Sequence, residues 1–302
     1  MMPTPCPLFG AGLGVALATP LHDDGTLDLP ALAGLVRHVV AGGADFVVAL
    51  GSTGEAATLD PDERDQVVVT TLAHRGGAAV FVGAGASATA QAAAFAARAQ
   101  QLGADGVLVV VPPYVKPTPA GIVAHFAAIG DAAPSLPIVA YNVPSRTGCN
   151  LRPETVAALW QLPHVVALKE SSGDLLQIVR IAAALPPGRV LLAGDDALLL
   201  PSVAVGATGV ISVAANVVPK RVAALLAAAR AGALARAHEL QRSLLPLFDA
   251  LAAEPNPIPL KTALALAGLA GPTLRAPLTV AEPTTRERLQ RALHQAEVVA
   301  HA

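Results

Sequence analysis

Eight short apolar runs recur along the chain, and each ends in polar or glycine-rich residues. They cover residues 14–19, 44–50, 78–83, 106–111, 136–142, 164–170, 189–195 and 208–213. The segments between them carry apolar residues at helical spacing, with helix-start signals at Asp60-Pro61 and Pro153-Glu154. Because apolar strands that alternate with helices form parallel sheets buried on both faces, this pattern predicts an α/β fold.

The number of strand and helix units favours a closed barrel. About eight units over ~220 residues fit a (β/α)8 TIM barrel better than an open doubly wound sheet, which stays the alternative because periodicity does not report closure. The strand pattern ends after Val218. Helical segments follow over residues 219–255, 258–271 and 284–300. We therefore expect a barrel over residues 1–223 and an appended C-terminal helical layer over residues 224–302. The proline-rich residues 254–261 should form a rigid connection that places Pro259 in the first turn of a helix.

Composition and charge exclude several classes of protein. Hydrophobic residues make up 53% of the 302 residues and charged residues 14%, which excludes a disordered protein and favours burial within or between subunits. The formal net charge of -2 comes without any run of Lys or Arg, so we expect neither a nucleic-acid nor a membrane partner. No apolar stretch reaches the ~20 residues of a membrane span and no secretory signal is recognised, so the expected location is the cytoplasm.

Catalytic groups in such a barrel lie at the carboxyl ends of the strands. These ends carry Gly51-Ser52-Thr53-Gly54-Glu55, Tyr114, Tyr141-Asn142, Lys169-Glu170, Gly194-Asp195 and Ile211-Ser212. Lys169 is the only one of the four lysines that follows a predicted strand. Lys116, Lys220 and Lys261 are expected to be solvated, or to extend their amines from an apolar surface into water.

Lys169 has the setting of a lysine nucleophile. Only the neutral amine attacks a carbonyl, and burial behind the apolar residues 165–168 would disfavour the charged form. A structural pair with Glu170 is the alternative, but neighbours on a strand point to opposite faces. The attack yields a carbinolamine whose hydroxyl must be protonated before it leaves. Tyr141 and Tyr114 are the only tyrosines, and both follow predicted strands, where they could carry protons.

Two segments could bind carboxylates. Residues 51–55 offer backbone N–H groups, two hydroxyls and glycines that allow close approach, although an ordinary strand-to-helix turn is the alternative. Arg146 follows Tyr141 in a tight loop and would suit a second carboxylate at the barrel mouth, unless it is a solvated surface arginine.

No metal site is predicted. Asp195 and Asp196 are expected to cap a helix, and all eight histidines fall in predicted helices or turns. Cys6 and Cys149 lack the spacing of metal ligands.

Six segments carry a family signature. In chain order they are GSTGEAATL, YNVPSRTGCNL, ALKESSGD, LLAGDDA, GVISVAANV and EPNPIPLK. Together they resemble the dihydrodipicolinate synthase (4-hydroxy-tetrahydrodipicolinate synthase) family, within the N-acetylneuraminate lyase superfamily of class I aldolases. The similarity runs from about Gly14 to the C-terminal helices.

The resemblance implies a Schiff-base lyase of lysine and diaminopimelate biosynthesis. It would condense pyruvate with L-aspartate 4-semialdehyde to 4-hydroxy-tetrahydrodipicolinate, without a cofactor other than the covalent Schiff base of pyruvate on Lys169. Ser52, Tyr141 and Tyr114 would form the proton relay. Tyr114 would reach in from a neighbouring subunit of a homotetramer built from tight dimers.

The resemblance also implies the substrate contacts. Thr53 would bind the pyruvate carboxylate, aided by the backbone around Ile211 and Gly194. Arg146 would bind the carboxylate of the semialdehyde, and it favours the synthase over superfamily members that accept longer polyhydroxylated substrates. Ser52 replaces a threonine of many members and keeps the hydroxyl. Another pyruvate-dependent class I aldolase, acting on N-acetylneuraminate or a 2-keto-3-deoxy sugar acid, and a catalytically silent keto-acid-binding barrel remain the alternatives.

We predict weak or absent feedback inhibition by L-lysine. Inhibited members of the family line an allosteric pocket with a histidine, a glutamate and a tyrosine, and the matching positions here are Pro61, Gln91 and Pro113. An initial-rate assay should therefore show little inhibition at submillimolar L-lysine. Half-maximal inhibition in that range would contradict the prediction.

Overall fold

Eight parallel strands form a closed barrel in the computed structural model, which describes residue 8 and residues 12–296. The strands are β1 Leu13–Ala16, β2 Phe46–Ala49, β3 Ala79–Gly83, β4 Gly106–Val110, β5 Ile138–Asn142, β6 Val165–Glu170, β7 Val190–Ala193 and β8 Gly209–Ser212. Each strand pairs with the next along the chain, and β8 pairs with β1 through Gly14 and Ile211. The predicted (β/α)8 barrel is confirmed, and the open sheet is excluded.

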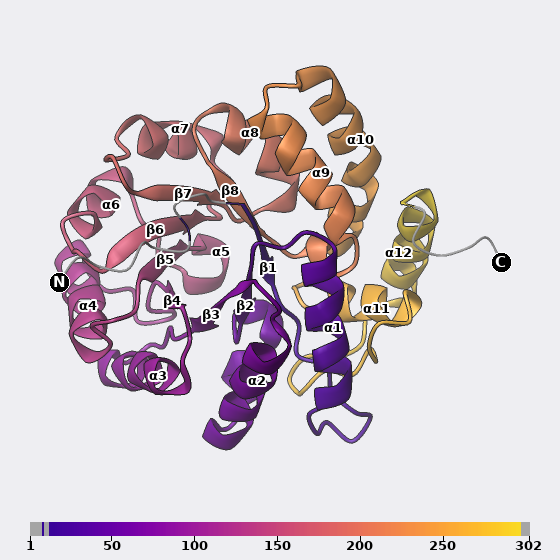
Figure 1. Cartoon of the computed structure of the whole chain (residues 1–302), viewed down its shortest axis with the longest axis horizontal. Helices are drawn as coiled ribbons and strands as arrows, with labels where there is room; N and C mark the ends of the chain where they lie inside the picture. The colour runs from indigo at the N-terminus through magenta and orange to yellow at the C-terminus, as the bar shows by residue number, and fades with distance from the viewer. Residues whose placement is uncertain (1–7, 9–11, 297–302) are drawn as a thin grey trace.

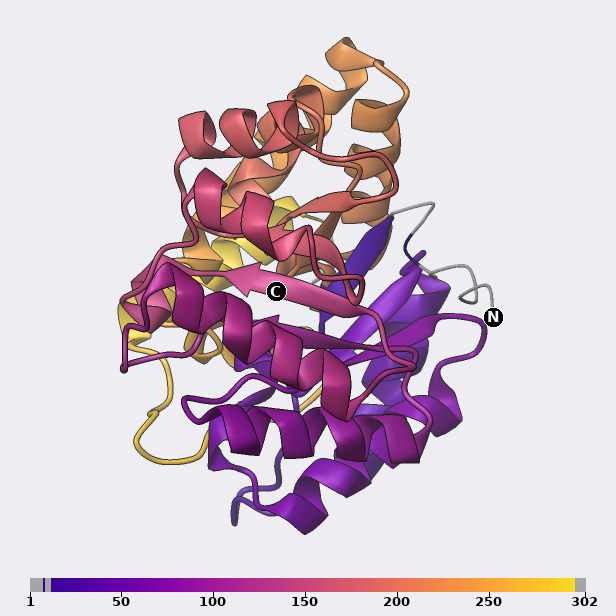
Figure 2. The same cartoon turned by 90° about the vertical axis from the view of Figure 1, so that its left-hand side faces the viewer.

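Helices surround the strands and extend beyond them at the C-terminal end (Figure 1). The α-helices are α1 Leu29–Ala41, α2 Pro61–His74, α3 Thr89–Leu102, α4 Pro119–Ala132, α5 Pro144–Thr147, α6 Pro153–Leu159, α7 Leu175–Ala183, α8 Leu199–Ala204, α9 Pro219–Arg230, α10 Leu234–Leu251, α11 Ile258–Leu266 and α12 Pro283–Gln295. Short 3-10 turns are η1 Ser52–Gly54, η2 Ala56–Thr58, η3 Asp196–Leu198 and η4 Ala214–Asn216. Seen from the side, the helices run across the outside of the strands (Figure 2).

The helix starts follow the sequence signals. Asp60 caps α2 by accepting from the N–H of Glu63, and the Glu63 carboxylate accepts in return from the N–H of Asp60. This reciprocal pair satisfies two of the N–H groups that a helix start leaves open, and Pro61 needs no partner because it lacks an N–H. Pro153 occupies the first turn of α6 in the same way, and Pro259 that of α11.

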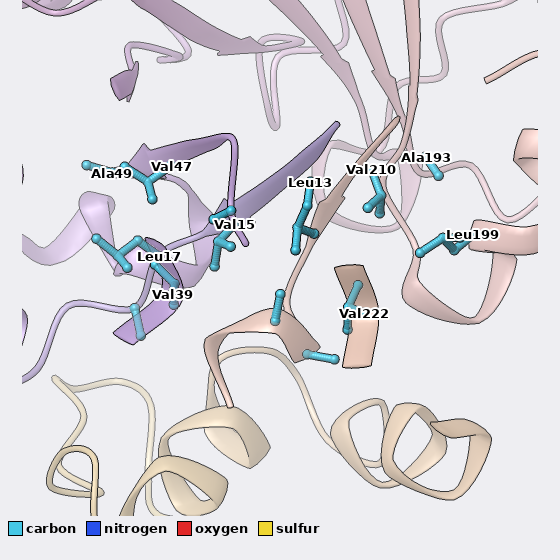
Figure 3. Packing of buried hydrophobic residues seen from close by; sticks show 14 of the residues in the cluster. Leu13, Val15, Leu17, Val39, Val47, Ala49, Ala193, Leu199, Val210 and Val222 are labelled. Atoms are coloured by element: carbon cyan, nitrogen blue, oxygen red, sulfur yellow. The ribbon is translucent and has the colours of Figure 1, made fainter. Parts of the chain in front are cut away.

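Side chains on the strands divide into two layers. Leu13 and Val15 of β1 point outward and pack with Val39 of α1 and Val222 of α9 (Figure 3). Inside the barrel the Phe46 and Phe81 rings meet edge to face, with centroids 5.6 Å apart. Gly14 leaves room for the Phe46 ring, since a Cβ there would overlap it. The barrel interior is therefore a packed core rather than a channel.

The C-terminal helices pack together beside the barrel. Helices α11 and α12 contact each other and α10, and α10 contacts α9. The boundary that we expected between the barrel and the helical layer, at residue 223, falls inside helix α9. Residues 297–300 of the last predicted helix lie outside the described part of the chain. Among the described residues, no helix has the length and apolar character needed to cross a membrane.

Lys261 contradicts its predicted exposure, whereas Lys116 and Lys220 are exposed as expected. Lys261 is only 1% exposed, forms an ion pair with Glu55 and donates to the carbonyl of Thr273 at 2.7 Å. Glu55 follows β2, so the counter-charge comes from a segment that local sequence around the helix does not reveal. Burial lowers the pKa of the Lys261 amine, and the hydrogen bond that the amine donates to Glu55 opposes that shift.

We predict that this ion pair is needed for stability. Lys261→Met should lower the free energy of unfolding by about 3–5 kcal/mol, because it leaves the buried Glu55 carboxylate unpaired. Urea denaturation would measure the loss, with Lys220→Met as an exposed control. The double variant Lys261→Met/Glu55→Gln should recover most of the stability, and a double variant as unstable as the single one would contradict the ion-pair explanation.

Candidate active site at the barrel mouth

A cavity of about 510 Å³ opens at the carboxyl ends of the strands. Six of the eight predicted site residues line it, namely Ser52, Thr53, Tyr141, Arg146, Lys169 and Gly194. The opposite wall comes from the end of α10 and the segment after it, including Phe248, Leu251, Glu254 and Asn256. The barrel and the C-terminal region therefore share one cavity.

Lys169 is buried beneath this cavity, with an exposed fraction of 4%. Lys169 and Tyr141 are register partners on β6 and β5. The Lys169 Nζ atom lies 4.3 Å from the centroid of the Tyr141 ring. Among the described residues, no carboxylate forms an ion pair with Lys169. The Lys169 side chain therefore borders both the cavity and the Tyr141 ring, where a ligand in the cavity would meet it.

Glu170 points away from Lys169, so the alternative pairing of these neighbours is wrong. Its carboxylate accepts from Asn142 Nδ2 at 3.0 Å and 3.1 Å, from the Ser172 N–H at 2.8 Å and from Gln177 Nε2 at 3.3 Å. Burial raises the pKa of Glu170, and the hydrogen bonds from Ser172 and Asn142 oppose the shift. This buried network fixes the ends of β5 and β6 relative to each other.

The loop after β2 forms a tight 3-10 turn that presents Ser52 and Thr53. Glu55 ends the turn in the left-handed region with φ 52°. Gly54 passes close to β1, since a Cβ there would lie 3.1 Å from the Leu17 carbonyl. The Thr53 side chain is buried and its Oγ1 accepts from Asn256 Nδ2 at 2.9 Å.

Asn256 connects the two predicted carboxylate-binding residues, a role that we did not predict from the sequence. Its amide holds Thr53, and its main-chain carbonyl accepts from Arg146 Nη2 at 2.7 Å. Arg146 lies in α5 and is exposed at the cavity. The only sequence signal was a polar residue between Pro255 and Pro257, which we interpreted as part of a rigid connection.

Asp195 and Asp196, the two adjacent acids after β7, have different contacts. Asp196 accepts from the N–H groups of Val213 and Ala214 at 3.0 Å and 2.8 Å, so it caps the turn η4 after β8 rather than the helix next to it in sequence. Asp195 lines the cavity. Burial raises the pKa of both carboxyl groups. The charge of Lys169 opposes the shift at Asp195, and at Asp196 the hydrogen bond from Ser212 is the largest opposing effect. The described residues contain no cluster of His, Cys, Asp and Glu that could hold a metal ion.

Two predicted site residues lie outside the cavity lining. Tyr114 is 90% exposed and has a φ of 72°, and its N–H donates to the Thr147 carbonyl at 3.1 Å. Its phenol is therefore exposed and is not part of the lining of the chain's own cavity. Ile211 is fully buried in the barrel interior. A backbone role of Ile211, and a role of Tyr114 in a neighbouring subunit, stay predictions.

We predict energetic coupling between Asn256 and Thr53. Asn256→Ala should lower the free energy of unfolding by about 1 kcal/mol, because the Thr53 hydroxyl loses its partner. In a Thr53→Val background the same change should cost clearly less. Guanidinium titrations of the two single variants and the double variant give the coupling, and additive effects would contradict it.

Comparisons with known proteins agree with this geometry. The model of the dihydrodipicolinate synthetase family matches residues 10–296. The 4-hydroxy-tetrahydrodipicolinate synthase of Thermosynechococcus vestitus is 44% identical over 92% of this chain and 94% of its own length. That of Methylococcus capsulatus is 43% identical over 94% of this chain and 98% of its own.

Solved structures give the same assignment. The dihydrodipicolinate synthase of Thermotoga maritima has a TM-score of 0.93 and 39% identity, covering 95% of this chain and 99% of that chain. A monomeric dihydrodipicolinate synthase variant has a TM-score of 0.94 and 38% identity, covering 98% of this chain and 99% of that chain. These matches confirm the resemblance seen in the motifs, and the chain belongs to the dihydrodipicolinate synthetase family.

Proposed function

We propose that this chain is a 4-hydroxy-tetrahydrodipicolinate synthase, which condenses pyruvate with L-aspartate 4-semialdehyde through a Schiff base on Lys169. The observation that carries the proposal is the buried, unpaired amine of Lys169 at the base of a cavity that also contains Ser52, Thr53, Tyr141 and Arg146. Family membership and the shared name of the relatives at about 42% to 44% identity support the choice of substrates.

The reaction starts at the Lys169 amine. The amine attacks the keto carbon of pyruvate, and the carbinolamine loses its hydroxyl as water once a proton reaches it. Tyr141, against the Lys169 amine, and Ser52, across the cavity, are the groups of this chain assigned to that proton transfer. Tyr114 of a neighbouring subunit would complete the relay. No cofactor besides the covalent intermediate is required.

Carbon–carbon bond formation follows on the same lysine. The iminium loses a proton from the pyruvate methyl group, and the resulting enamine attacks the aldehyde carbon of the semialdehyde. The amino group of the adduct then displaces Lys169 from the imine carbon, which closes the ring and regenerates the free amine. We assign Thr53, with the backbone at Ile211 and Gly194, to the pyruvate carboxylate and Arg146 to the second carboxylate.

Arg146 also favours the synthase over the alternatives. Its guanidinium is held at the cavity by the Asn256 carbonyl, where it can pair with a carboxylate on a short substrate. An aldolase for N-acetylneuraminate or a 2-keto-3-deoxy sugar acid would need polar groups for a long hydroxylated tail instead. A silent keto-acid-binding barrel would not need the lysine and tyrosine together.

We further propose a homotetramer of tight dimers, located in the cytoplasm with its small-molecule substrates. Two exposed apolar surfaces would form the two kinds of contact. One is at Tyr114 and Val115, which are 90% and 54% exposed. The other is on α7, where Leu175, Leu176 and Val179 are 39%, 56% and 38% exposed. Exposed apolar surfaces of this kind usually mark sites where another protein or subunit binds and covers them.

Lys169→Ala should lower turnover by about 10³-fold or more, because no other lysine among the described residues lines the cavity. A coupled assay with aspartate semialdehyde and a dihydrodipicolinate reductase measures turnover. Borohydride with pyruvate, followed by peptide mass spectrometry, should label position 169 in the natural chain. Lys220→Ala is the matched control and should keep both signals.

Two results would contradict the proposal. Full turnover of Lys169→Ala, or an unlabelled Lys169 after trapping, would exclude the Schiff-base mechanism. Trapping with pyruvate but no turnover of aspartate semialdehyde would instead favour another aldolase or a silent barrel.

Leu176→Asp should dissociate the tetramer into dimers, because it places a charge in the apolar surface of α7. Sedimentation velocity measures the change in mass. Val69→Asp provides the control, since Val69 on α2 is 52% exposed and lies outside both surfaces. A natural chain that sediments as a monomer, like the monomeric variant among its relatives, would contradict the assembly.

A further inference from the structure

One hydroxyl at the base of the cavity has no partner. Ser171 directly follows β6, and its N–H donates to the Asn142 carbonyl at 2.9 Å, which fixes its backbone. The residue is 8% exposed and lines the cavity. Its Oγ atom is buried and forms no hydrogen bond with any residue that the structure describes. The other buried serine or threonine of the lining, Thr53, is already bonded to Asn256.

The position of Gly194 shows what the Ser171 hydroxyl faces. A Cβ atom at position 194 would overlap Ser171 Oγ and would lie 3.1 Å from Lys169 Cε. The absent side chain of Gly194 therefore leaves the hydroxyl and the end of the Lys169 side chain beside the same small space. A group attached to the Lys169 amine would enter the cavity that this hydroxyl lines.

An unpaired buried hydroxyl is costly. Leaving one without a hydrogen bond costs about 1–3 kcal/mol of folding free energy. Solvent offsets little of that cost, because less than 1 Å² of Ser171 Oγ is exposed in this side-chain arrangement. A ligand attached to Lys169 could supply the missing partner, because Gly194 leaves Ser171 Oγ and Lys169 Cε beside the same space in the cavity lining.

We propose that Ser171 donates a hydrogen bond to the oxygen of pyruvate while Lys169 attacks it. As the nitrogen–carbon bond forms, the π electrons of the carbonyl move to this oxygen, and a hydroxyl donor stabilises the developing charge. Ser171 transfers no proton. The oxygen later receives its protons from the lysine nitrogen and the relay and leaves as water. The inference rests on the Schiff base of the proposed function but not on the identity of the second substrate.

The test compares Ser171→Ala with the natural chain in the step that needs pyruvate alone. Rapid mixing with pyruvate, quenching with borohydride at timed intervals and intact-mass spectrometry give the rate of Schiff-base formation. Ser171→Ala should form it about tenfold or more slowly. Its melting temperature should be unchanged or higher, because the substitution removes a hydroxyl that has no partner in the described part of the chain.

Ser172→Ala is the matched control. Its hydroxyl lies one residue further along, outside the cavity lining, and accepts from the Asp174 N–H at 3.2 Å. This variant should form the Schiff base at the natural rate. Equal rates for Ser171→Ala and the natural chain would overturn the proposal.

Two other outcomes also overturn it. A slow Ser171→Ala that melts several degrees lower would assign the hydroxyl a structural role. A variant with a normal trapping rate and a raised KM only for the semialdehyde would assign it to the second substrate. Failure of the natural chain to trap pyruvate at all would refute the proposed function instead, so the two failures can be told apart.

Discussion

Pairing of β1 with β8 is the constraint on which the rest of this structure depends. Gly14 and Ile211 lie side by side although almost two hundred residues separate them, and this contact closes the sheet. In a closed parallel barrel every strand ends at the same rim. Closure thus brings the loop after β2, the end of β6 and the turn after β7 into one cavity. The tightly packed rings of Phe46 and Phe81 fill the interior below it, so that the cavity has a floor.

The C-terminal region completes the site as well as covering the barrel. It contacts the loop after β2 at two levels, through the buried Lys261–Glu55 ion pair and through the bond between Asn256 and Thr53. The same Asn256 holds Arg146 with its carbonyl. Since both links involve buried groups, movement of the C-terminal region would leave polar atoms unpaired. The predicted division into a barrel and a helical layer follows the order of the elements along the chain. The cavity does not follow this division, because residues of both parts line it.

Polar groups around the β6 end differ in how fully they are paired. Glu170, on the outer face of the strand, is surrounded by hydrogen-bond donors. On the cavity side, the Lys169 amine has no counter-ion and the Ser171 hydroxyl has no hydrogen-bond partner among the described residues. Consistently paired polar groups are the rule in folded proteins, and departures from it concentrate at functional sites. The alternation of a strand places the paired and unpaired groups on opposite faces within three residues.

The sequence by itself determined the elements and pointed to Lys169 as the candidate nucleophile. Eight apolar runs predicted the eight strands, and Lys169 could be identified because a lysine at the end of an apolar strand is unusual. These are local signals, since strand and helix periodicities record which face of an element is buried. The family motifs added the expected roles of residues such as Tyr141 and Arg146, which periodicity does not carry.

Only the tertiary structure decided which distant groups meet. Lys261 was expected to be solvated or to extend its amine from an apolar helix into water, but Glu55, about two hundred residues away in the sequence, pairs with it inside the protein. Asp196 caps a turn after β8 instead of its own helix, and Asn256 holds Thr53 across the cavity. Hydrogen bonds and ion pairs act over a few ångströms in space, whereas a sequence pattern reports neighbours along the chain. Closure of the barrel brings residues that are distant in the sequence close together in space, and these residues form the site.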